Sequence, residues 1–310
     1  MKAAVYEKYG SPDVVYIKNI DKPVPQDNEV LVKIYATTVT IGDSRMRRFD
    51  VPAGQWLFAR LFLGVFSPRR KILGMELAGV VEAIGANVTR FKVGDAVMAS
   101  TFDANFGAHT EYKCLKQDGL IELKPDNISF EEAAAAVGGG MTAMRCLKKA
   151  TIQPGQEVLI YGASGAVGTN AVQIAKNYLG AEVTAVCSTR NLELATSIGA
   201  DYVIDYTKQD FTQNGKTYDV IFDAVAKFPE SQAKTALKPG GTYLNAHHDS
   251  NGSLRKEELT FIVELLASCK LKPVIDRCYP LEEIVDAYRF VDTGRKRGNV
   301  VITVKEKTHA

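Results

Sequence analysis

Apolar and polar residues alternate in short stretches through the first third of the chain. This period of two is typical of half-buried strands, and prolines, glycines and polar turns separate the stretches. The predicted strands are residues 2–6, 14–17, 30–35, 77–84 and 96–99. Short strands joined by turns predict an antiparallel, barrel-like domain.

The pattern changes at Ser129. Ser129 and Glu132 have the spacing of a capping box, which marks the start of a helix. The alanine-rich run that follows predicts a helix that is broken by the glycines at 138–140, and a second helix over residues 141–150. A proline and a glycine at 154–155 then separate these helices from the next part of the chain.

From residue 158 onward, strand patterns and helix patterns alternate. The predicted strands are 158–161, 182–188, 202–206, 220–225 and 242–246, and the predicted helices are 167–179, 192–198 and 229–237. This order with short connections predicts an α/β fold with a doubly wound parallel sheet. The last part predicts a helix over 254–269, a strand over 271–275, a helix over 281–291 and a strand over 300–304.

Three glycines follow the first of these parallel strands. Gly162, Gly165 and Gly168 stand at three-residue spacing between the apolar run 158–161 and a helical pattern. In a dinucleotide-binding turn, the first glycine allows a sharp bend, the second lets the backbone approach a pyrophosphate, and the third lets the helix pack on the strand. The helix N-terminus then offers unpaired N–H groups to the phosphates. The alternative is a plain tight turn.

An aromatic segment interrupts the first domain over residues 50–71. Phe58, Leu61, Phe62, Val65 and Phe66 have the spacing of one helical face, and basic residues follow at 69–71. Three interpretations are open. The segment is a helix that packs on the core, an apolar wall of a substrate cleft, or a helix that lies on a membrane surface.

Composition narrows the class of protein. The chain has 310 residues and a formal net charge of +2, which gives no reason to expect nucleic acid as a partner. Its first residues resemble a strand rather than a signal peptide, and no apolar run is long enough to span a membrane. The five cysteines are scattered, with no C-x-x-C spacing. We therefore expect a protein of the reducing cytoplasm that does not associate with membranes.

Several motifs, spread over most of the chain, resemble those of one enzyme superfamily. They are residues 74–81 (GMELAGVV), 93–97 (VGDAV), 107–112 (GAHTEY), 133–142, 158–168 and 297–302 (RGNVVI). Together they resemble the medium-chain dehydrogenase/reductase superfamily, and within it the zinc-free quinone oxidoreductase branch. The resemblance implies a GroES-like β-barrel domain over residues 1–125 and 272–310, and a Rossmann NADP-binding domain over residues 126–271. It also implies a homodimer.

Zinc-dependent alcohol dehydrogenases of the superfamily need three Cys, His or acidic ligands for a catalytic zinc. Met75 stands where these relatives carry a His ligand, and no cysteine lies near residues 41–43 or 137–140. Without a Lewis acid an unactivated alcohol is difficult to oxidise. A quinone or a conjugated enone takes hydride at carbon, and its oxygen then needs only a hydrogen-bond donor or a proton from water. We therefore expect no metal.

The end of the second parallel strand bears on the choice of nicotinamide cofactor. NAD-binding sites usually place an acidic residue there, to hold the ribose 2′-hydroxyl. Here the strand runs into Ser188, Thr189 and Arg190. Two hydroxyls and a guanidinium suit a 2′-phosphate, so NADPH is the expected cofactor. The alternative is that Ser188 caps the next helix and Arg190 is solvated.

The resemblance implies further contacts with the cofactor. Near the phosphates and the nicotinamide ribose it places Thr142, together with the turn residues Gly162, Ala163, Ser164, Gly165, Ala166 and Val167. Tyr206 borders the adenine side. The ends of later strands supply Ala224, Val225, Asn245, Ala246 and His247, and the returning segment supplies Arg297, Gly298 and Asn299.

The same resemblance points to residues for the chemistry. Thr40 is expected to donate a hydrogen bond to the cofactor amide or to a substrate carbonyl, and Asp43 to orient neighbours such as Arg45 or Arg47. The substrate is expected near aromatic side chains, namely Trp56, Phe58, Phe62, Phe102 and Phe106. No side chain stands out as a general acid, so positioning and a proton from water are expected to suffice.

These features predict an enzyme that transfers hydride from NADPH to a quinone or to an α,β-unsaturated carbonyl. An enoyl-thioester reductase and a zinc-independent alcohol dehydrogenase are the alternatives among enzymes. An NADPH-binding sensor without turnover is the alternative from another class.

Overall fold

The structure is a computed structural model that describes residues 1–51, 54 and 56–304. The chain forms two compact units. The first unit runs from Met1 to Val137 and resumes at Ile275, and the second unit is Gly138–Val274. The first unit is therefore built from both ends of the chain.

The first unit is mainly antiparallel sheet. Strands β1 (Lys2–Tyr6) and β2 (Val15–Asn19) pair with each other. A larger sheet has the order β13-β14-β3-β4-β5-β7, and β6 pairs with β3 as well. Its strands are β3 (Glu29–Thr38), β4 (Glu76–Ile84), β5 (Ala96–Ser100), β6 (Tyr112–Lys116), β7 (Ile121–Leu123), β13 (Ile275–Pro280) and β14 (Asn299–Thr303).

The predicted alternation explains the core of this sheet. Val30, Val32 and Ile34 lie on one side of β3 and are buried together with Leu77 and Val81 from β4. Side chains two residues apart on a strand face the same way, so the period of two gives one continuous apolar face. The sequence did not predict β6 and β7, which complete this sheet.

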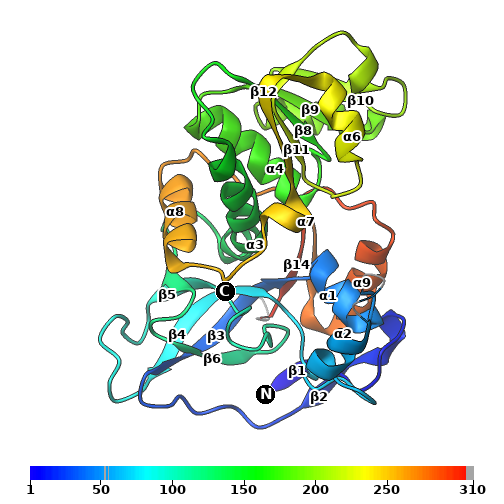
Figure 1. Cartoon of the computed structure of the whole chain (residues 1–310). Coiled ribbons are helices and arrows are strands. Elements are labelled where there is room, and N and C mark those ends of the chain that lie inside the picture. Colours follow the sequence, from blue (N-terminus) through cyan, green and yellow to red (C-terminus); the bar gives the residue numbers. More distant parts are fainter. Residues whose placement is uncertain (52–53, 55, 305–310) are drawn as a thin grey trace. The chain divides into compact units, whose positions relative to one another are not determined.

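The C-terminal segment returns to the first unit and completes its sheet. In Figure 1 the red strand β14 runs beside the blue strand β3, and the two pair antiparallel with Val301 opposite Thr38. Helix α9 (Ile284–Asp292) precedes β14 and packs Ile284, Ala287, Tyr288 and Val291 into the core. A strand expected over residues 271–275 is wrong: the strand begins at Ile275 and extends to Pro280.

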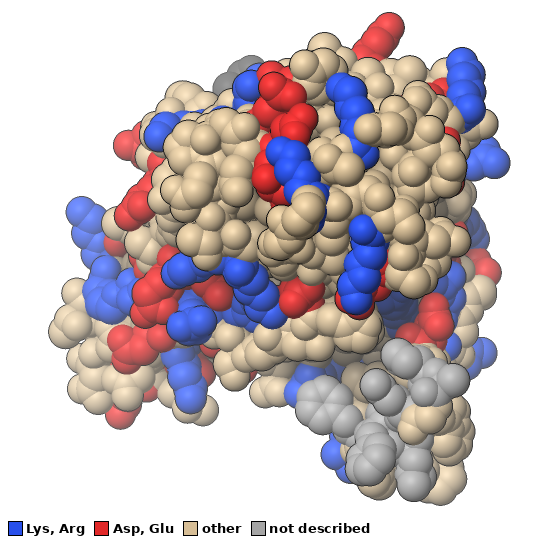
Figure 2. Space-filling model, turned by 45° about the horizontal axis from the view of Figure 1, so that its top comes forward, with Lys and Arg blue, Asp and Glu red and all other residues tan. Residues whose placement is uncertain are grey.

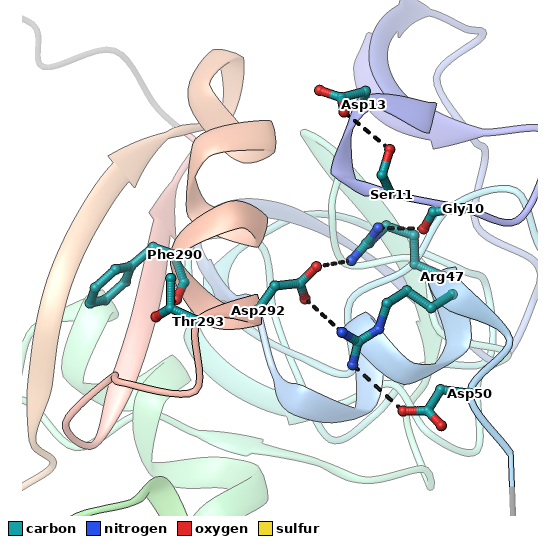
Figure 3. A network of polar contacts seen from close by, with 9 residues as sticks. Gly10, Ser11, Asp13, Arg47, Asp50, Phe290, Asp292 and Thr293 are labelled. Carbon is teal, nitrogen blue, oxygen red and sulfur yellow. Dashed lines mark hydrogen bonds and ion pairs between the residues drawn. The ribbon is translucent and has the colours of Figure 1, made fainter.

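A buried ion pair ties α9 to α1 (Ile41–Arg48), a helix that the sequence did not predict. Figure 3 shows the Arg47 guanidinium between the Gly10 carbonyl and the Asp292 carboxylate. Arg47 is fully buried, and its guanidinium lies 5.1 Å from the centre of the Tyr288 ring. The contact joins two segments that are far apart in the sequence.

The second unit contains the predicted parallel sheet. Its strands are β8 (Glu157–Tyr161), β9 (Glu182–Cys187), β10 (Tyr202–Asp205), β11 (Tyr218–Asp223) and β12 (Leu237–Asn245). They pair in parallel in the order β10-β9-β8-β11-β12. The apolar run of β8 is buried, as expected for a strand with neighbours on both sides. The doubly wound sheet is therefore confirmed.

The helices of this unit are α4 (Ala166–Gln173), α5 (Leu192–Ser197), α6 (Glu230–Ala233), α7 (Ala246–Asp249) and α8 (Lys256–Ala267). One turn of π-helix, Ile174–Tyr178, continues α4. Gly180 has a φ of +69° at the end of this helical run, as a helix stop signal requires.

The predicted helix break at the three glycines is wrong. Helix α3 (Phe130–Leu147) runs through residues 138–140 without interruption. A Cβ on Gly139 would lie 2.7 Å from the Ala166 carbonyl oxygen, and one on Gly140 would lie 3.0 Å from Ile262 in α8. Figure 1 shows α3 between α4 and α8. The glycines therefore serve close packing of helices, and this packing outweighs their low helix propensity.

The aromatic segment contains a shorter helix than its spacing predicted. Helix α2 (Trp56–Leu63) ends where Gly64 adopts a φ of +129°. Val65 and Phe66 therefore lie beyond the helix rather than on its face, and both are exposed. The side chains of Phe58 and Phe62 lie outside the described residues.

The surface carries charges of both signs. Basic and acidic side chains are interspersed over the face shown in Figure 2, in keeping with the net charge of +2. All five cysteines are free of disulfides. None of the helices that the structure describes has the length and apolar character needed to cross a membrane.

Candidate functional site

The glycine turn follows β8 and leads into α4. Gly162 has a φ of +78°, and a Cβ there would lie 2.6 Å from the side chain of Val225. A Cβ on Gly168 would lie 2.2 Å from the Gly162 carbonyl oxygen. The first and third glycines are therefore required by the fold of the turn itself, as the sequence predicted.

Gly165 differs from the other two glycines of the turn. A Cβ at this position would have one neighbour within 4 Å, the Gly162 carbonyl oxygen at 3.6 Å, which is an ordinary contact. The local fold does not need a glycine here. What the missing side chain leaves open is the space in front of the α4 N-terminus, where a pyrophosphate approaches the backbone in a dinucleotide site.

The N-terminus of α4 has donors to offer. Gly165 is the N-cap residue and provides no side-chain acceptor. Within the described part of the chain, no acceptor lies within hydrogen-bond distance of the Ala166 and Val167 amides. Two N–H groups at the positive end of a helix dipole suit an anionic ligand. The turn therefore fits the diphosphate of a dinucleotide.

Asn191 links the turn to the end of β9. Its side-chain amide donates to Ser164 Oγ at 2.9 Å and to Ser188 Oγ at 3.2 Å. The structure thus brings Ser164 and Ser188 together. Ser188 makes no side-chain cap to the helical turn that it precedes, so the alternative role as a cap does not apply.

An acidic residue that the sequence argument missed stands beside Thr189. No acid follows β9, but the Thr189 hydroxyl donates to Asp205 at the end of the neighbouring strand β10. Thr207 also donates to Asp205, at 2.7 Å. The Thr189 and Thr207 hydrogen bonds hold the pKa of Asp205 below its usual range, so the carboxylate is charged at neutral pH. The side-by-side arrangement of β9 and β10 creates this contact.

The carboxyl ends of parallel strands meet at one edge of the sheet. Gly162, Ser188, Tyr206, Ala224 and Asn245 each lie at the end of a strand or directly after one. Strand order reverses between β8 and β11, and Val225 packs on Gly162 at this switch point. Ligands of doubly wound sheets bind at such a switch point.

The prediction that Asn245, Ala246 and His247 all end the last strand is wrong for Ala246 and His247, which lie in helix α7. Asn245 ends β12 and caps the short helix α7, because its side-chain oxygen accepts from the His247 amide at 2.9 Å. Thr142 lies one turn along α3 from Gly139, which contacts the start of α4. Thr142 therefore lies on the helix face that leads toward α4.

Thr40 and Asp43 form the capping box of α1. The Thr40 hydroxyl accepts from the Asp43 amide at 3.0 Å and donates to Asp43 Oδ2 at 2.6 Å. The buried Asp43 carboxylate also accepts from the Gly74 amide at 2.9 Å. The one hydroxyl proton of Thr40 is thus engaged, and a hydrogen bond from Thr40 to a ligand requires this bond to be given up. Arg47, expected near Asp43, pairs instead with Asp292.

Comparisons with known proteins agree with this geometry. A family model described as "Alcohol dehydrogenase GroES-like domain" matches residues 26–156, and two described as "Zinc-binding dehydrogenase" match residues 166–246 and 244–302. The chain is 35% identical to 2-methylene-furan-3-one reductase of Solanum lycopersicum, over 97% of this chain and 79% of that protein. It is 32% identical to the chloroplastic NADPH-dependent alkenal/one oxidoreductase of Arabidopsis thaliana, with the same coverage.

The chain belongs to the medium-chain dehydrogenase/reductase superfamily, in its quinone oxidoreductase-like branch. Among solved structures, the quinone oxidoreductase of Coxiella burnetii is similar with a TM-score of 0.86 and 27% identity, over 98% of this chain and 99% of that one. The GroES-like and doubly wound parts of the predicted fold are confirmed.

Two of the matching family models are described as "Zinc-binding dehydrogenase", which raises the question whether this chain binds zinc. Met75 Sδ lies 3.6 Å from the Thr40 hydroxyl, and a Cβ on Gly42 would lie 2.7 Å from the Met75 methyl group. A thioether packed in this way is a poor zinc ligand. Across residues 1–51, 54 and 56–304, no three His, Cys, Asp or Glu side chains are grouped as metal ligands. The donor set does not fit a catalytic zinc.

His109, in the motif shared with the superfamily, has both ring nitrogens engaged. Nε2 lies 2.8 Å from the Thr38 carbonyl oxygen and so carries the proton. Nδ1 therefore accepts from the Tyr288 hydroxyl at 3.3 Å. His109 is buried, and its two contacts join β3 and α9 within the first unit.

The returning segment contains a lysine that sequence reasoning missed. Lys296 Nζ donates to the Gly298 carbonyl at 2.5 Å, and burial lowers the pKa of Lys296 to about 8. Gly298 has a φ of +58°, Asn299 begins β14, and the Arg297 amide donates to Asp276 at 2.7 Å. Lys296 is partly buried, and the desolvation of its ammonium group, which no local pattern reveals, sets it apart.

The predicted aromatic wall divides into two clusters. The rings of Phe102 and Phe106 lie edge to face at 5.5 Å. Trp56 packs with Phe49 at 6.2 Å, and the Arg60 guanidinium lies 5.1 Å from the Trp56 ring. A role of these side chains in substrate binding stays a prediction.

Proposed function

We propose that the protein is a zinc-free, NADPH-dependent oxidoreductase that reduces quinones or α,β-unsaturated carbonyls. The observation that carries the proposal is the glycine turn, in which Gly165 leaves space before two unpaired amides of α4. The names of the tomato reductase and the Arabidopsis alkenal/one oxidoreductase support the same reaction class.

Cofactor binding uses the edge of the parallel sheet. The Ala166 and Val167 amides hold the diphosphate, and Ser188 and Arg190 hold the 2′-phosphate. Thr142, Asn245, Ala246, His247 and the segment Arg297, Gly298 and Asn299 contact the nicotinamide half. A reduced nicotinamide, when bound, supplies the hydride. The protein residues bind and orient the two reactants, and this positioning is the larger part of their contribution.

Met75 stands where zinc-dependent relatives carry a ligand and is itself a poor zinc ligand, and this favours a substrate that is already conjugated. An acceptor that is already polarised needs no Lewis acid, because its oxygen can take a hydrogen bond or a proton from water. Thr40 and Asp43 hold the start of α1 in place beside Met75. We place the aromatic residues Trp56, Phe58, Phe62, Phe102 and Phe106 near the substrate.

We also propose a cellular compartment and partners for the protein. The scattered free cysteines favour a reducing compartment, and we propose the cytoplasm. We further propose a homodimer that acts on small molecules, without nucleic acid or membrane as a partner.

The test is steady-state oxidation of NADPH with three substrate panels: quinones, enones and enoyl thioesters. We expect turnover on quinones or enones that survives treatment with a chelator, by protein whose metal content is below one ion per chain. Activity that is lost to the chelator and restored by zinc would contradict the zinc-free assignment. Turnover of enoyl thioesters alone would favour that class of reductase, and NADPH binding with no turnover would favour a sensor.

A further inference from the structure

A cavity of about 730 Å³ lies within the first unit, apart from the residues predicted to bind cofactor or substrate. It is lined by residues 69–72, by the loop that contains Asp103, Asn105 and Gly107, and by strand β6. Small-molecule sites of proteins usually have volumes of roughly 300–1,000 Å³. The cavity is therefore large enough for a metabolite.

Positive charge is concentrated around this cavity. Its lining contains five basic residues, Arg69, Arg70, Lys71, Lys113 and Lys116, but two acidic ones, Glu29 and Asp103. Glu29 keeps its charge, whereas Lys71 pairs with Glu7 at 3.5 Å, so four of the five basic side chains remain against the two acidic ones. The chain as a whole has a net charge of only +2. The lining of the cavity is thus more positive than the rest of the surface, on which charges of both signs are mixed.

Lys113 is the central cation. Its ammonium group donates to the Ala104 carbonyl at 2.9 Å, and no second acceptor lies within hydrogen-bond distance among the residues that the structure describes. An ammonium group has three N–H donors, so two remain for a ligand. Gly107 makes room for this group, because a Cβ there would lie 3.2 Å from Lys113 Nζ.

Arg70 stands close enough to Lys113 for the two like charges to interact. Burial is the main cause that lowers the pKa of Lys113, the nearby charge of Glu29 raises it, and the charge of Arg70 lowers it. Burial also lowers the pKa of Arg70, whose guanidinium donates to Asn105 Oδ1 at 2.8 Å and lies 4.8 Å from the Phe106 ring. The two partly desolvated cations repel each other, and an anion that contacts both would reduce this repulsion.

We propose that this cavity binds a phosphate-bearing small molecule, with its phosphate held by Lys113 and Arg70. Lys116 and Arg69 add charge around the phosphate. Ile72 and Leu120 offer an apolar surface to the rest of the ligand. A phosphate suits the pair, because a guanidinium and an ammonium together supply several charge-assisted donors. The proposal does not depend on the oxidoreductase activity.

The test is calorimetric titration of the full chain with inorganic pyrophosphate at low salt. We expect saturable binding with a Kd below ~1 mM. Lys113→Met and Arg70→Gln should each raise the Kd by about tenfold or more, and Lys116→Gln, on an exposed side chain, by a smaller factor. Lys124→Met is the matched control. Lys124 is also partly buried and donates to the Pro125 and Ile128 carbonyls, but it does not line the cavity.

Pyrophosphate could also bind at the glycine turn, and the variants separate the two sites. Binding that Lys113→Met and Arg70→Gln leave unchanged would place the anion elsewhere and overturn the proposal. So would the absence of saturable binding, or an equal loss in Lys124→Met. If Lys113→Met does not fold, acylation of lysines in the wild-type protein decides. Pyrophosphate should protect Lys113 and leave Lys124 reactive, and equal labelling of Lys113 with and without pyrophosphate would overturn the proposal.

Discussion

The ion pair between α1 and α9 offers a direct test of how the two ends of the chain are held together. In Asp292→Asn, the Arg47 guanidinium keeps its charge but loses its carboxylate partner. Arg47 is fully buried, with 0% of its side chain exposed, and Asp292 is 18% exposed. Removing one partner of a buried pair costs ~3–5 kcal/mol, because the remaining charge is uncompensated. The exposed edge of Asp292 and its distant second partner, Arg48 at 3.9 Å, favour the lower end of this range.

The assay is equilibrium unfolding in urea, followed by tryptophan fluorescence. Trp56 is the one tryptophan of the chain and lies in the first unit, so the signal reports on the unit that contains the ion pair. Asp13→Asn is the matched control. Asp13 pairs with Arg289, also on α9, but the two side chains are 62% and 56% exposed. Exposed pairs are screened by water, so this variant should unfold like the wild type.

A double substitution completes the test. Arg47→Met combined with Asp292→Leu removes both charges and should recover most of the stability lost in Asp292→Asn, since apolar replacements of buried pairs are often neutral. The reasoning is refuted if Asp292→Asn shifts the urea midpoint no more than Asp13→Asn does. It is also refuted if the double variant is less stable than Asp292→Asn.

Four further outcomes are expected. Lys296→Met should raise stability at pH 7, because the folded state depresses the pKa of this lysine to about 8. For the wild type, the unfolded state binds more protons between pH 8 and the ordinary lysine pKa near 10.4. Stability relative to Lys296→Met should therefore rise through this window, and urea midpoints measured against pH would reveal a flat difference if the idea is wrong. Gly165→Ala should fold normally and weaken NADPH binding about tenfold or more in a fluorescence titration. Gly168→Ala should lose stability as well, because its Cβ would lie 2.2 Å from a carbonyl oxygen. Wild-type NADPH affinity in Gly165→Ala would contradict the role assigned to the open turn. Arg190→Ala should weaken NADPH and leave NADH unaffected in the same titration, and an equal loss toward both would count against the 2′-phosphate assignment. Asp205→Asn should tighten NADPH binding, because it removes a negative charge beside Thr189; unchanged affinity would place the 2′-phosphate away from this carboxylate.

The features that could be predicted from the sequence are those set by local spacing. The turn Gly162–Gly165–Gly168 and the capping box of Ser129 and Glu132 depend on residues within a few positions of each other. For the same reason, the alternation of apolar residues predicted most strands of the antiparallel part, although not β6 and β7, and the apolar run at 158–161 predicted the first strand of the parallel sheet. The motifs also predicted the superfamily, because they are spread over most of the chain.

The features that were missed depend on contacts between distant segments. Asp205 approaches Thr189 only because β10 pairs with β9, and the Lys296 ammonium group is desolvated only once the C-terminal segment has folded back. The glycines at 138–140 looked like a helix break because their propensity is low. Their role becomes clear only from Ala166 and Ile262, which pack against them.

The position of β14 has a consequence for synthesis on the ribosome. Residues are made in order, so the whole second unit is synthesised before Asn299–Thr303. Until then, the end of β3 is paired with β4 on one side only, and Asp292 has not yet reached Arg47. An unpaired strand edge is a place where nascent chains pair wrongly with one another. The first unit to be started is therefore the last to be finished, because the unit inserted within it is synthesised in between.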